Sequence, residues 1–290
     1  MRFCPACRVG LTHPVPTREE LSRFYRSGAY RSPGGQRFLG PIEYLVSLSR
    51  RRRKTRIERF ARPGTLLDVG CGRGLFLHLM RAGGWRVAGI EYDDESAVAA
   101  RETYGLDVGT GGLEGAGFPP GSFDVITMCH VLEHLPDPGD AVERCRCLLR
   151  PGGLLVAAVP NLSSLQASVG KEQWFHLDPP HHLFHFTLEG LLALLERSRF
   201  RVRRIRRFDL EYDPFGWLQT LLNRTCRSRN ALFDRLRNDE GEAAPPPAGD
   251  VAVSLLLSPI LAPASLALSL LDSFLLHRGG TVEIFATPEG

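Results

Sequence analysis

Residues 66–77 read LLDVGCGRGLFL, in which a short apolar run is followed by an acid, three alternating glycines and a second apolar run. The apolar residues before the glycines predict a buried strand, and those after them predict a helix that begins at once. Glycines at such a junction allow a tight turn and the close approach of a ligand to the backbone. The stretch therefore predicts an α/β fold with a ligand at the carboxyl end of the first strand.

The spacing of these glycines argues against two common nucleotide-binding loops. A dinucleotide fingerprint has the form G-x-G-x-x-G and a P-loop ends in Gly-Lys-Ser/Thr, whereas Gly70, Gly72 and Gly74 alternate and no Lys is near. Asp68, inside the motif, would repel a pyrophosphate and suits a ligand with a cation or donor groups. The pattern favours S-adenosylmethionine, with Gly70 and Gly72 admitting its methionine part and Asp68 accepting from its amino group.

A second acid follows the next predicted strand. Residues 86–91 end in Glu91, which lies about 20 residues beyond the glycine loop, the spacing of an acid that binds ribose hydroxyls. The alternative is an exposed acid in a turn.

Predicted strands and helices alternate along much of the chain, which indicates a parallel sheet covered on both faces. Strands are expected at residues 65–69, 86–91, 106–108, 123–128, 153–159, 200–208 and 281–286. Helices are expected at residues 75–82, 96–104, 139–149, 187–197 and 214–236, around 19–25, and at 41–60, where arginines are expected to form a solvated basic face.

Four segments in this order resemble the class I S-adenosylmethionine-dependent methyltransferases: LLDVGCGRG, GIEYDD, GSFDVITMCHVLEHLPDP and LLRPGGLLVAAVPN. The resemblance covers residues 65–200. It implies a Rossmann-like, doubly wound sheet of seven mostly parallel strands in the order 3-2-1-4-5-7-6, with the last strand antiparallel. It also implies cofactor contacts from Asp68, Gly70, Cys71, Gly72, Gly74, Glu91, Tyr92, Leu113, Cys129 and His130, with Tyr92 and Leu113 near the adenine.

Histidines supply candidates for the acceptor side. Transfer to a hydroxyl calls for alignment and a base, and His titrates near neutral pH. The order of preference is His182, then His130, then His134, because the segment WFHLDPPHHLFHF resembles one that closes over the acceptor in a large methyltransferase subfamily. No metal is expected, because the histidine cluster lacks a completing acid pair and Cys4 and Cys7 offer only half of a zinc site.

Composition limits the partners and the compartment. The 36 basic and 32 acidic residues give a net charge of +4, which does not indicate nucleic-acid binding. Seven irregularly spaced cysteines do not suggest a disulfide framework, so a cytoplasmic location is expected. The predicted domains are an N-terminal extension with a degenerate half zinc-knuckle, the methyltransferase core, a helical and apolar insertion, and the last core strand, at residues 1–40, 41–210, 211–278 and 279–290.

The apolar residues 251–276 contain one charge, Asp272, and two prolines, Pro259 and Pro263. Their length would allow a membrane span, but the prolines divide them and a sheet strand is expected to follow. We expect a helical hairpin that dips into the membrane interface or a cap over the active site, with the basic residues 50–54 and 201–207 facing lipid. The alternative is a helical pair packed on the core or in a homodimer interface.

The sequence thus predicts a methyltransferase that acts at oxygen on a small, lipophilic or membrane-linked acceptor, in the cytoplasm or on the inner face of the membrane. Two alternatives stay open: an S-adenosylmethionine-binding scaffold or partner-binding protein without transfer activity, and a nicotinamide oxidoreductase, which the glycine spacing disfavours.

Overall fold

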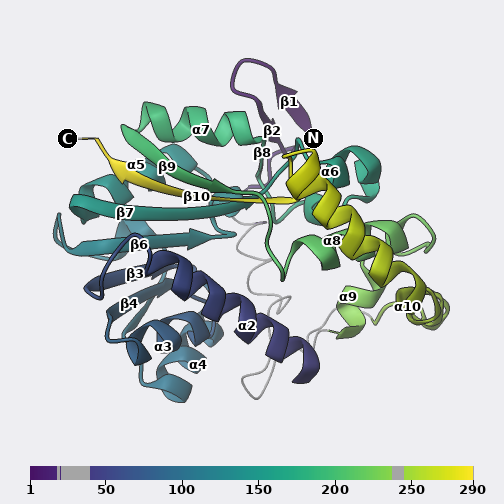
Figure 1. Cartoon of the computed structure of the whole chain (residues 1–290), viewed down its shortest axis with the longest axis horizontal. Helices are drawn as coiled ribbons and strands as arrows, with labels where there is room; N and C mark the ends of the chain where they lie inside the picture. Colours follow the sequence, from purple (N-terminus) through teal and green to yellow (C-terminus); the bar gives the residue numbers. More distant parts are fainter. Residues whose placement is uncertain (18–19, 21–39, 237–244, 290) are drawn as a thin grey trace. The chain divides into compact units, whose positions relative to one another are not determined.

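The computed structural model describes residues 1–17, 20, 40–236 and 245–289 (Figure 1). Two expected segments lie outside the described residues. One is the short helix expected around residues 19–25, of which only residue 20 is described, and the other is the part of the expected linker up to residue 244.

The chain forms two compact units that interleave along the sequence. One, here called the sheet unit, contains Val46–Val159, Glu189–Arg206 and Glu283–Gly290. The other, here called the helical unit, contains Met1–Leu45, Pro160–Leu188 and Arg207–Val282.

A seven-stranded sheet is the centre of the sheet unit. Its strands are β3 (Thr65–Val69), β4 (Arg86–Glu91), β5 (Val108–Thr110), β6 (Phe123–Cys129), β7 (Leu149–Pro160), β9 (Phe200–Arg206) and β10 (Thr281–Pro288). They lie in the order β5-β4-β3-β6-β7-β10-β9, and β10 runs antiparallel to β9. Counted along the chain, this order is 3-2-1-4-5-7-6, so the predicted Rossmann-like arrangement is confirmed.

Helices cover both faces of this sheet, because alternate residues of a strand point to opposite faces. Val125 of β6 packs with α3 (Leu75–Ala82) and α4 (Asp94–Tyr104) in one buried cluster. Met128, on the opposite face, lies against Cys145 of α5 (Pro138–Leu148), with sulfur atoms 3.4 Å apart. The fourth helix, α7 (Leu188–Arg197), joins β8 to β9.

Several elements differ from the sequence expectation. The strand expected at 153–159 spans Leu149–Pro160, the strand expected at 200–208 ends at Arg206, and the helix expected at 214–236 is two helices, Asp213–Asn223 and Ala231–Leu236.

Two further boundaries differ for local reasons. Helix α4 begins two residues earlier than expected because the Asp93 carboxylate accepts from the backbone N–H of Ser96 and caps the first turn. The third strand lies at Val108–Thr110 instead of 106–108, because α4 ends at Gly105 in the left-handed conformation and Leu106 and Asp107 form the connection.

The basic helix α2 (Gly40–Ile57) does not present a wholly solvated basic face, so that expectation was wrong. Arg53 is only 4% exposed, and its Nε lies 3.8 Å from Oε1 of Glu283 in β10. Arg56 donates to the same oxygen at 2.9 Å. A buried acid on the last strand therefore turns this part of α2 toward the sheet.

The helical unit contains a second, three-stranded sheet in the order β1-β2-β8. The hairpin of β1 (Arg2–Cys4) and β2 (Val9–Leu11) pairs with β8 (Phe184–Phe186), and both pairings are antiparallel. Sequence patterns did not indicate these strands, since three residues are too few to establish an alternation of apolar and polar side chains.

The helices of this unit are α6 (Leu165–Gly170), α8 (Asp213–Asn223), α9 (Ala231–Leu236) and α10 (Ala248–Leu270), and the π-helical turn Leu271–Leu275 continues α10. The expected hairpin was wrong, because α10 runs without interruption through Pro259 and Pro263 and lies along α8 (Figure 1). Each proline removes one backbone donor, and packing on α8 keeps the helix continuous despite this cost.

Candidate cofactor site and active site

The glycine loop between β3 and α3 leaves an open approach to its backbone. Gly70, Gly72 and Gly74 all have positive φ angles, of 70°, 54° and 82°. A Cβ at Gly70 would lie 2.4 Å from Val131 Cγ2, and one at Gly74 would lie 2.5 Å from Leu106 Cδ1, whereas one at Gly72 would meet no described atom within 4 Å. Gly70 and Gly74 are therefore needed for packing, and Gly72 leaves room for a ligand.

Asp68 is a buried acid at the end of β3. Its Oδ1 accepts from Thr127 Oγ1 at 2.5 Å, and only 5% of the residue is exposed. Burial raises the pKa of Asp68 to about 6, against the hydrogen bond from Thr127 and the positive charge of Arg53. A nearby ligand cation stabilises the ionised form of such a buried acid. The positively charged amino group of a bound methionine moiety is a cation of this kind.

Glu91, the last residue of β4, reaches the glycine loop. Its Oε2 accepts from the backbone N–H of Gly72 at 2.6 Å, and its Oε1 accepts from that of Asp93 at 3.1 Å. Burial raises the pKa of Glu91, and the hydrogen bonds from Asp93 and Gly72 oppose this rise. Each carboxylate oxygen has a further lone pair, so Glu91 can still accept from ribose hydroxyls.

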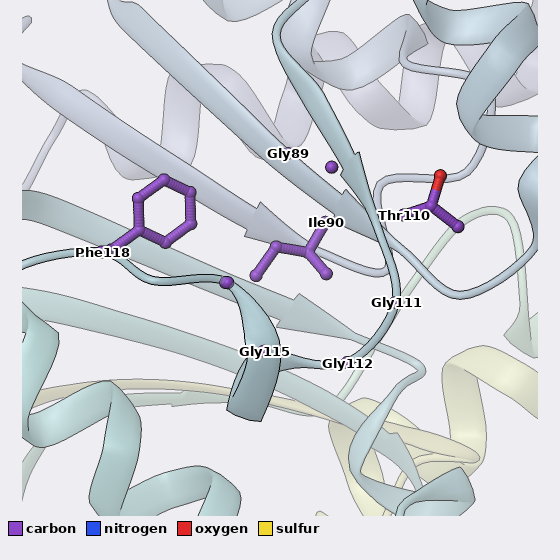
Figure 2. A pocket seen from close by; sticks show the side chains of 9 residues that line it. Gly89, Ile90, Thr110, Gly111, Gly112, Gly115 and Phe118 are labelled. Carbon is purple, nitrogen blue, oxygen red and sulfur yellow. The ribbon is translucent and has the colours of Figure 1, made fainter.

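A pocket of about 100 Å³ lies at the carboxyl ends of β4 and β5 (Figure 2). None of the described residues that line it is charged, and five of them are glycines. The lining residues are Gly89, Ile90, Gly109, Thr110, Gly111, Gly112, Gly115, Ala116 and Phe118. An uncharged, flat ring such as adenine suits walls of this kind.

The two residues expected near the adenine do not themselves line this pocket. Tyr92 is 56% exposed, and Leu113 is buried in the short 3-10 helix η1 (Leu113–Gly115) between lining residues. Their cofactor contacts stay predictions. Sequence reasoning missed Ile90 and Phe118, although the position of Ile90 directly before Glu91 was a usable signal.

The two cysteines of the expected site carry no charge at neutral pH. Burial raises the pKa of Cys71 far above its ordinary value, with the nearby charges of Asp68 and Glu91 adding to the effect. Burial also raises the pKa of Cys129, at the end of β6, to about 12. Neither thiol therefore competes as a nucleophile for an electrophilic methyl group.

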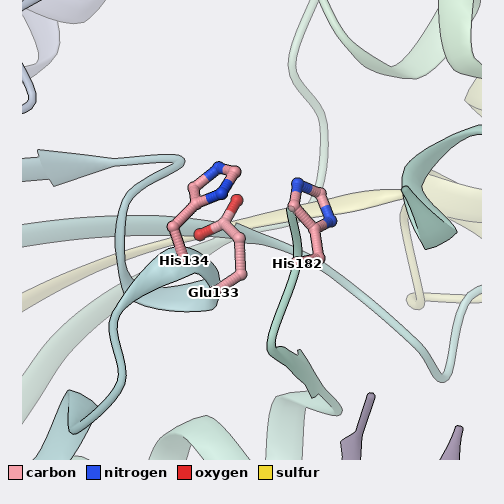
Figure 3. Close-up of side chains that lie close together, drawn as sticks. All are labelled: Glu133, His134 and His182. Atoms are coloured by element: carbon pink, nitrogen blue, oxygen red, sulfur yellow. The ribbon is translucent and has the colours of Figure 1, made fainter. Parts of the chain in front are cut away.

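His130 follows β6 in a left-handed backbone conformation, with φ of 58°. Its Nδ1 lies 3.3 Å from Oε1 of Glu133, a buried acid on the 3-10 helix η2 (Leu132–His134). Figure 3 shows Glu133 and His134 on this turn. A left-handed conformation is strained for a residue with a side chain, and such strain clusters at functional sites.

His182 precedes β8 in the helical unit, whereas His130 and His134 belong to the sheet unit. His182 Nδ1 lies 2.8 Å from the carbonyl oxygen of His176. A carbonyl can only accept, so Nδ1 carries the proton and Nε2 of the neutral ring can accept one. The contact therefore fixes the tautomer that a general base needs.

His185 has a structural environment instead. Thr12 Oγ1 donates to the backbone oxygen of His182 at 2.6 Å and lies 3.0 Å from His185 Nε2, which must therefore donate to Thr12. Burial lowers the pKa of His185 to about 4, and the positive N-terminus adds to this effect. His185 is therefore neutral at physiological pH and ties β8 to the N-terminal hairpin.

The strand order, the open glycine loop, and the buried Asp68 and half-buried Glu91 at adjacent strand ends define a Rossmann-like, nucleoside-binding protein of the methyltransferase class. The methyltransferase domain family matches residues 43–205, and the chain belongs to this family. It is an S-adenosylmethionine-dependent methyltransferase, as the resemblance in its sequence predicted.

Two curated relatives and one solved structure illustrate the similarity. The chain is 35% identical over 199 residues to a ubiquinone biosynthesis O-methyltransferase of Xanthomonas campestris. The matched region covers 64% of the chain and 82% of that protein. It is 32% identical over 179 residues to a protein of the same name from Bordetella avium, covering 55% and 70%. An S-adenosylmethionine-dependent methyltransferase from Mesorhizobium loti has the same fold, with a TM-score of 0.52 at 17% identity, covering 84% of this chain and 99% of that one.

Proposed function

We propose that this methyltransferase acts on the oxygen of a small, lipophilic acceptor. The names of the two curated relatives, both O-methyltransferases of ubiquinone biosynthesis, support a hydroxyl acceptor. The observation that carries the proposal within this chain is the tautomer of His182, because its Nε2 can take the proton that a hydroxyl must lose.

The residues of the sheet unit hold the cofactor in this proposal. Bound S-adenosylmethionine supplies an electrophilic methyl group on its sulfonium. Asp68 accepts from the amino group, Glu91 accepts from the ribose hydroxyls, and the pocket beside Ile90 takes the adenine. The open space at Gly72 fits this arrangement, since a side chain there would occupy the ligand's place.

Two histidines are the candidates for moving the acceptor proton. His182 is fixed by the His176 carbonyl, and His130 is oriented by Glu133, whose negative charge stabilises a protonated ring. His134 ranks third, since it is the half-exposed last residue of η2. We assign the base to His182 first and to His130 second.

Matched histidine variants test this assignment. His182→Gln is expected to keep its affinity for S-adenosylmethionine in calorimetry and to lose on the order of 100-fold or more in kcat, because an amide cannot take up the proton. His181→Gln, a change at the neighbouring position, is expected to keep kcat. Methyl transfer is measured with labelled cofactor on phenolic acceptors that carry or lack an alkyl tail.

The outcomes separate the parts of the proposal. An unchanged kcat and pH profile in His182→Gln, with loss in His130→Gln, would assign the base to His130. Transfer to amines but not to any phenol would overturn the oxygen assignment. Binding of NAD in place of S-adenosylmethionine would overturn the cofactor assignment.

We also propose that the enzyme works in the cytoplasm. None of the seven cysteines, all of which the structure describes, forms a disulfide, which suits a reducing compartment. Cell fractionation with antibody detection tests the location, and recovery from an oxidising compartment would contradict it.

A further inference from the structure

Helix α10 packs with its polar side inward. The residues that it buries against the helical unit are mostly small and polar: Ser254, Ser265, Ser269, and then Asp272 and Ser273 in the π-helical turn. The large apolar side chains point to solvent, with Leu256 74% exposed, Ile260 70% and Leu275 71%. This is the reverse of an ordinary surface helix, which buries its apolar stripe.

Hydrogen bonds fix this rotation of the helix. Both oxygens of Asp272 accept from the first turn of α6, from the backbone N–H groups of Leu165 at 3.0 Å and Gln166 at 3.2 Å. At the other end, Ser254 Oγ lies 3.4 Å from Cys226 Sγ. A rotation that buried the leucines would break these contacts, so the exposure of the apolar side is built into the fold.

The exposed apolar residues form one extended surface, here called the α10 face. It consists of Val253, Leu255, Leu256, Ile260, Leu266, Leu270, Leu271, Phe274, Leu275 and Leu276. Contiguous apolar surfaces of this kind mark contacts with lipid or with other proteins.

Among the described residues at the ends of the α10 face, two exposed arginines, Arg227 and Arg278, stand against one acid, Asp250. At its N-terminal end, the exposed Arg227 is held next to α10, because its backbone N–H and that of Ser228 donate to the Asp250 carboxylate. At its C-terminal end, His277 and Arg278 are exposed. Between residues 251 and 276 the only charged residue is Asp272, which is buried. An apolar centre with an excess of positive charge at its ends is complementary to an anionic lipid surface.

The same helix is unsuited to crossing the bilayer, although Ala248–Leu275 is long and apolar enough to do so. The protein covers its polar stripe from Ser254 to Asp272. Pro259 and Pro263 also lack the N–H groups that would bond to carbonyls one turn earlier, and such carbonyls need water or headgroups. A position parallel to the membrane plane meets both conditions.

We propose that the α10 face docks the enzyme onto the surface of an anionic lipid membrane, with α10 lying in the plane of the interface. This proposal deepens the proposed function. The benefit of docking rests on that function, because a lipophilic acceptor is concentrated in the membrane. The docking itself does not depend on the acceptor.

Flotation of the full chain with vesicles tests the proposal. Binding is expected to vesicles of phosphatidylcholine and phosphatidylglycerol in equal parts, and to weaken about tenfold or more on phosphatidylcholine alone, since each basic residue near an anionic surface contributes about 1 kcal/mol. Leu256→Glu and Leu275→Glu are each expected to weaken binding by about tenfold or more. Val98→Glu, at a 38% exposed apolar position of α4, is the matched control and is expected to bind like the wild type.

Three results would overturn the docking. The first is that the folded chain does not float with anionic vesicles, and the second is that both glutamate variants float as well as the wild type. The third is a lipid-free dimer in ultracentrifugation that Leu256→Glu dissociates, which would make a second copy the occupant of the α10 face. Calorimetry with S-adenosylmethionine and transfer to a water-soluble phenol are measured on the same samples. Their failure would count against the proposed function and leave the flotation result standing.

Discussion

Substitution of Asp68 by Asn keeps an oxygen that can accept the hydrogen bond of Thr127 Oγ1 but removes the negative charge. The acid is almost completely buried, and burial raises its pKa from 3.8 to about 6 in the folded chain. Folding therefore disfavours the charged form, and the two states bind protons differently between these two pH values.

The sign and the size follow from this difference. Below pH 3.8 the acid is protonated in both states, and as the pH rises to about 6 the unfolded chain loses its proton first, which destabilises the fold. The loss amounts to roughly 3 kcal/mol, because each pH unit of pKa difference is worth about 1.4 kcal/mol. Asp68→Asn escapes this loss, so its stability relative to the wild type is expected to rise between pH 4 and 7.

Urea unfolding of both proteins without cofactor, at several pH values, measures this relative stability. Asp124→Asn is the control of opposite sign. Burial of Asp124 is outweighed by hydrogen bonds from Thr65 and by Arg150, which together lower its pKa, so this variant is expected to lose most near neutral pH. A relative stability of Asp68→Asn that does not change with pH would refute the argument.

Cofactor binding should change in the opposite direction to stability. Loss of a charged hydrogen bond to the amino group of S-adenosylmethionine is expected to weaken binding by about 10- to 100-fold. The affinity of the wild type is expected to fall as the pH drops below about 6, where Asp68 takes up its proton. Calorimetry measures both effects, and an unchanged affinity of Asp68→Asn would remove Asp68 from the site.

Three further changes test other parts of the structure. Gly72→Ala is expected to cost only about 1 kcal/mol of stability but at least about tenfold in cofactor affinity, whereas Gly70→Ala is expected to melt at a much lower temperature because its Cβ would strike Val131. His185→Gln is expected to remove the loss of stability that the wild type shows in urea unfolding as the pH falls from 6.5 to about 4, since only the unfolded chain takes up that proton. Asp272→Ala is expected to cost about 2 kcal/mol in thermal or urea unfolding, because the first turn of α6 loses its acceptors, and an unchanged stability would contradict the role assigned to this acid.

Much of the sheet unit could be predicted from the sequence because its signals are local. The strand, the alternating glycines and the helix of residues 66–77 stand next to one another in the chain, and Glu91 follows at a characteristic distance. The strand order came from the resemblance of four segments and not from their pattern. The role of Asp68 and the histidines as site residues stays a prediction, although the structure supplies Asp68 with a buried environment and His182 with a defined tautomer.

Other features could not be predicted, because they depend on residues far apart in the chain. The inward turn of Arg53 needs Glu283 on the last strand, and the N-terminal hairpin needs β8, more than 150 residues later. The orientation of α10 is the clearest case, since its periodicity alone would place the leucines inside and the serines outside.

By itself, the sequence determined which residues turn the chain and which cofactor those turns admit, since backbone conformation at glycine and the charge of Asp68 are local properties. Only the tertiary structure decided which side of each helix is buried. In α2 and α10 the buried side carries polar groups that distant segments satisfy, Glu283 for Arg53 and the first turn of α6 for Asp272, and in α10 this leaves the leucines exposed. The cofactor, S-adenosylmethionine, could therefore be inferred from a few residues of the sequence. The α10 face, which we propose contacts the membrane, could be recognised only from the folded chain.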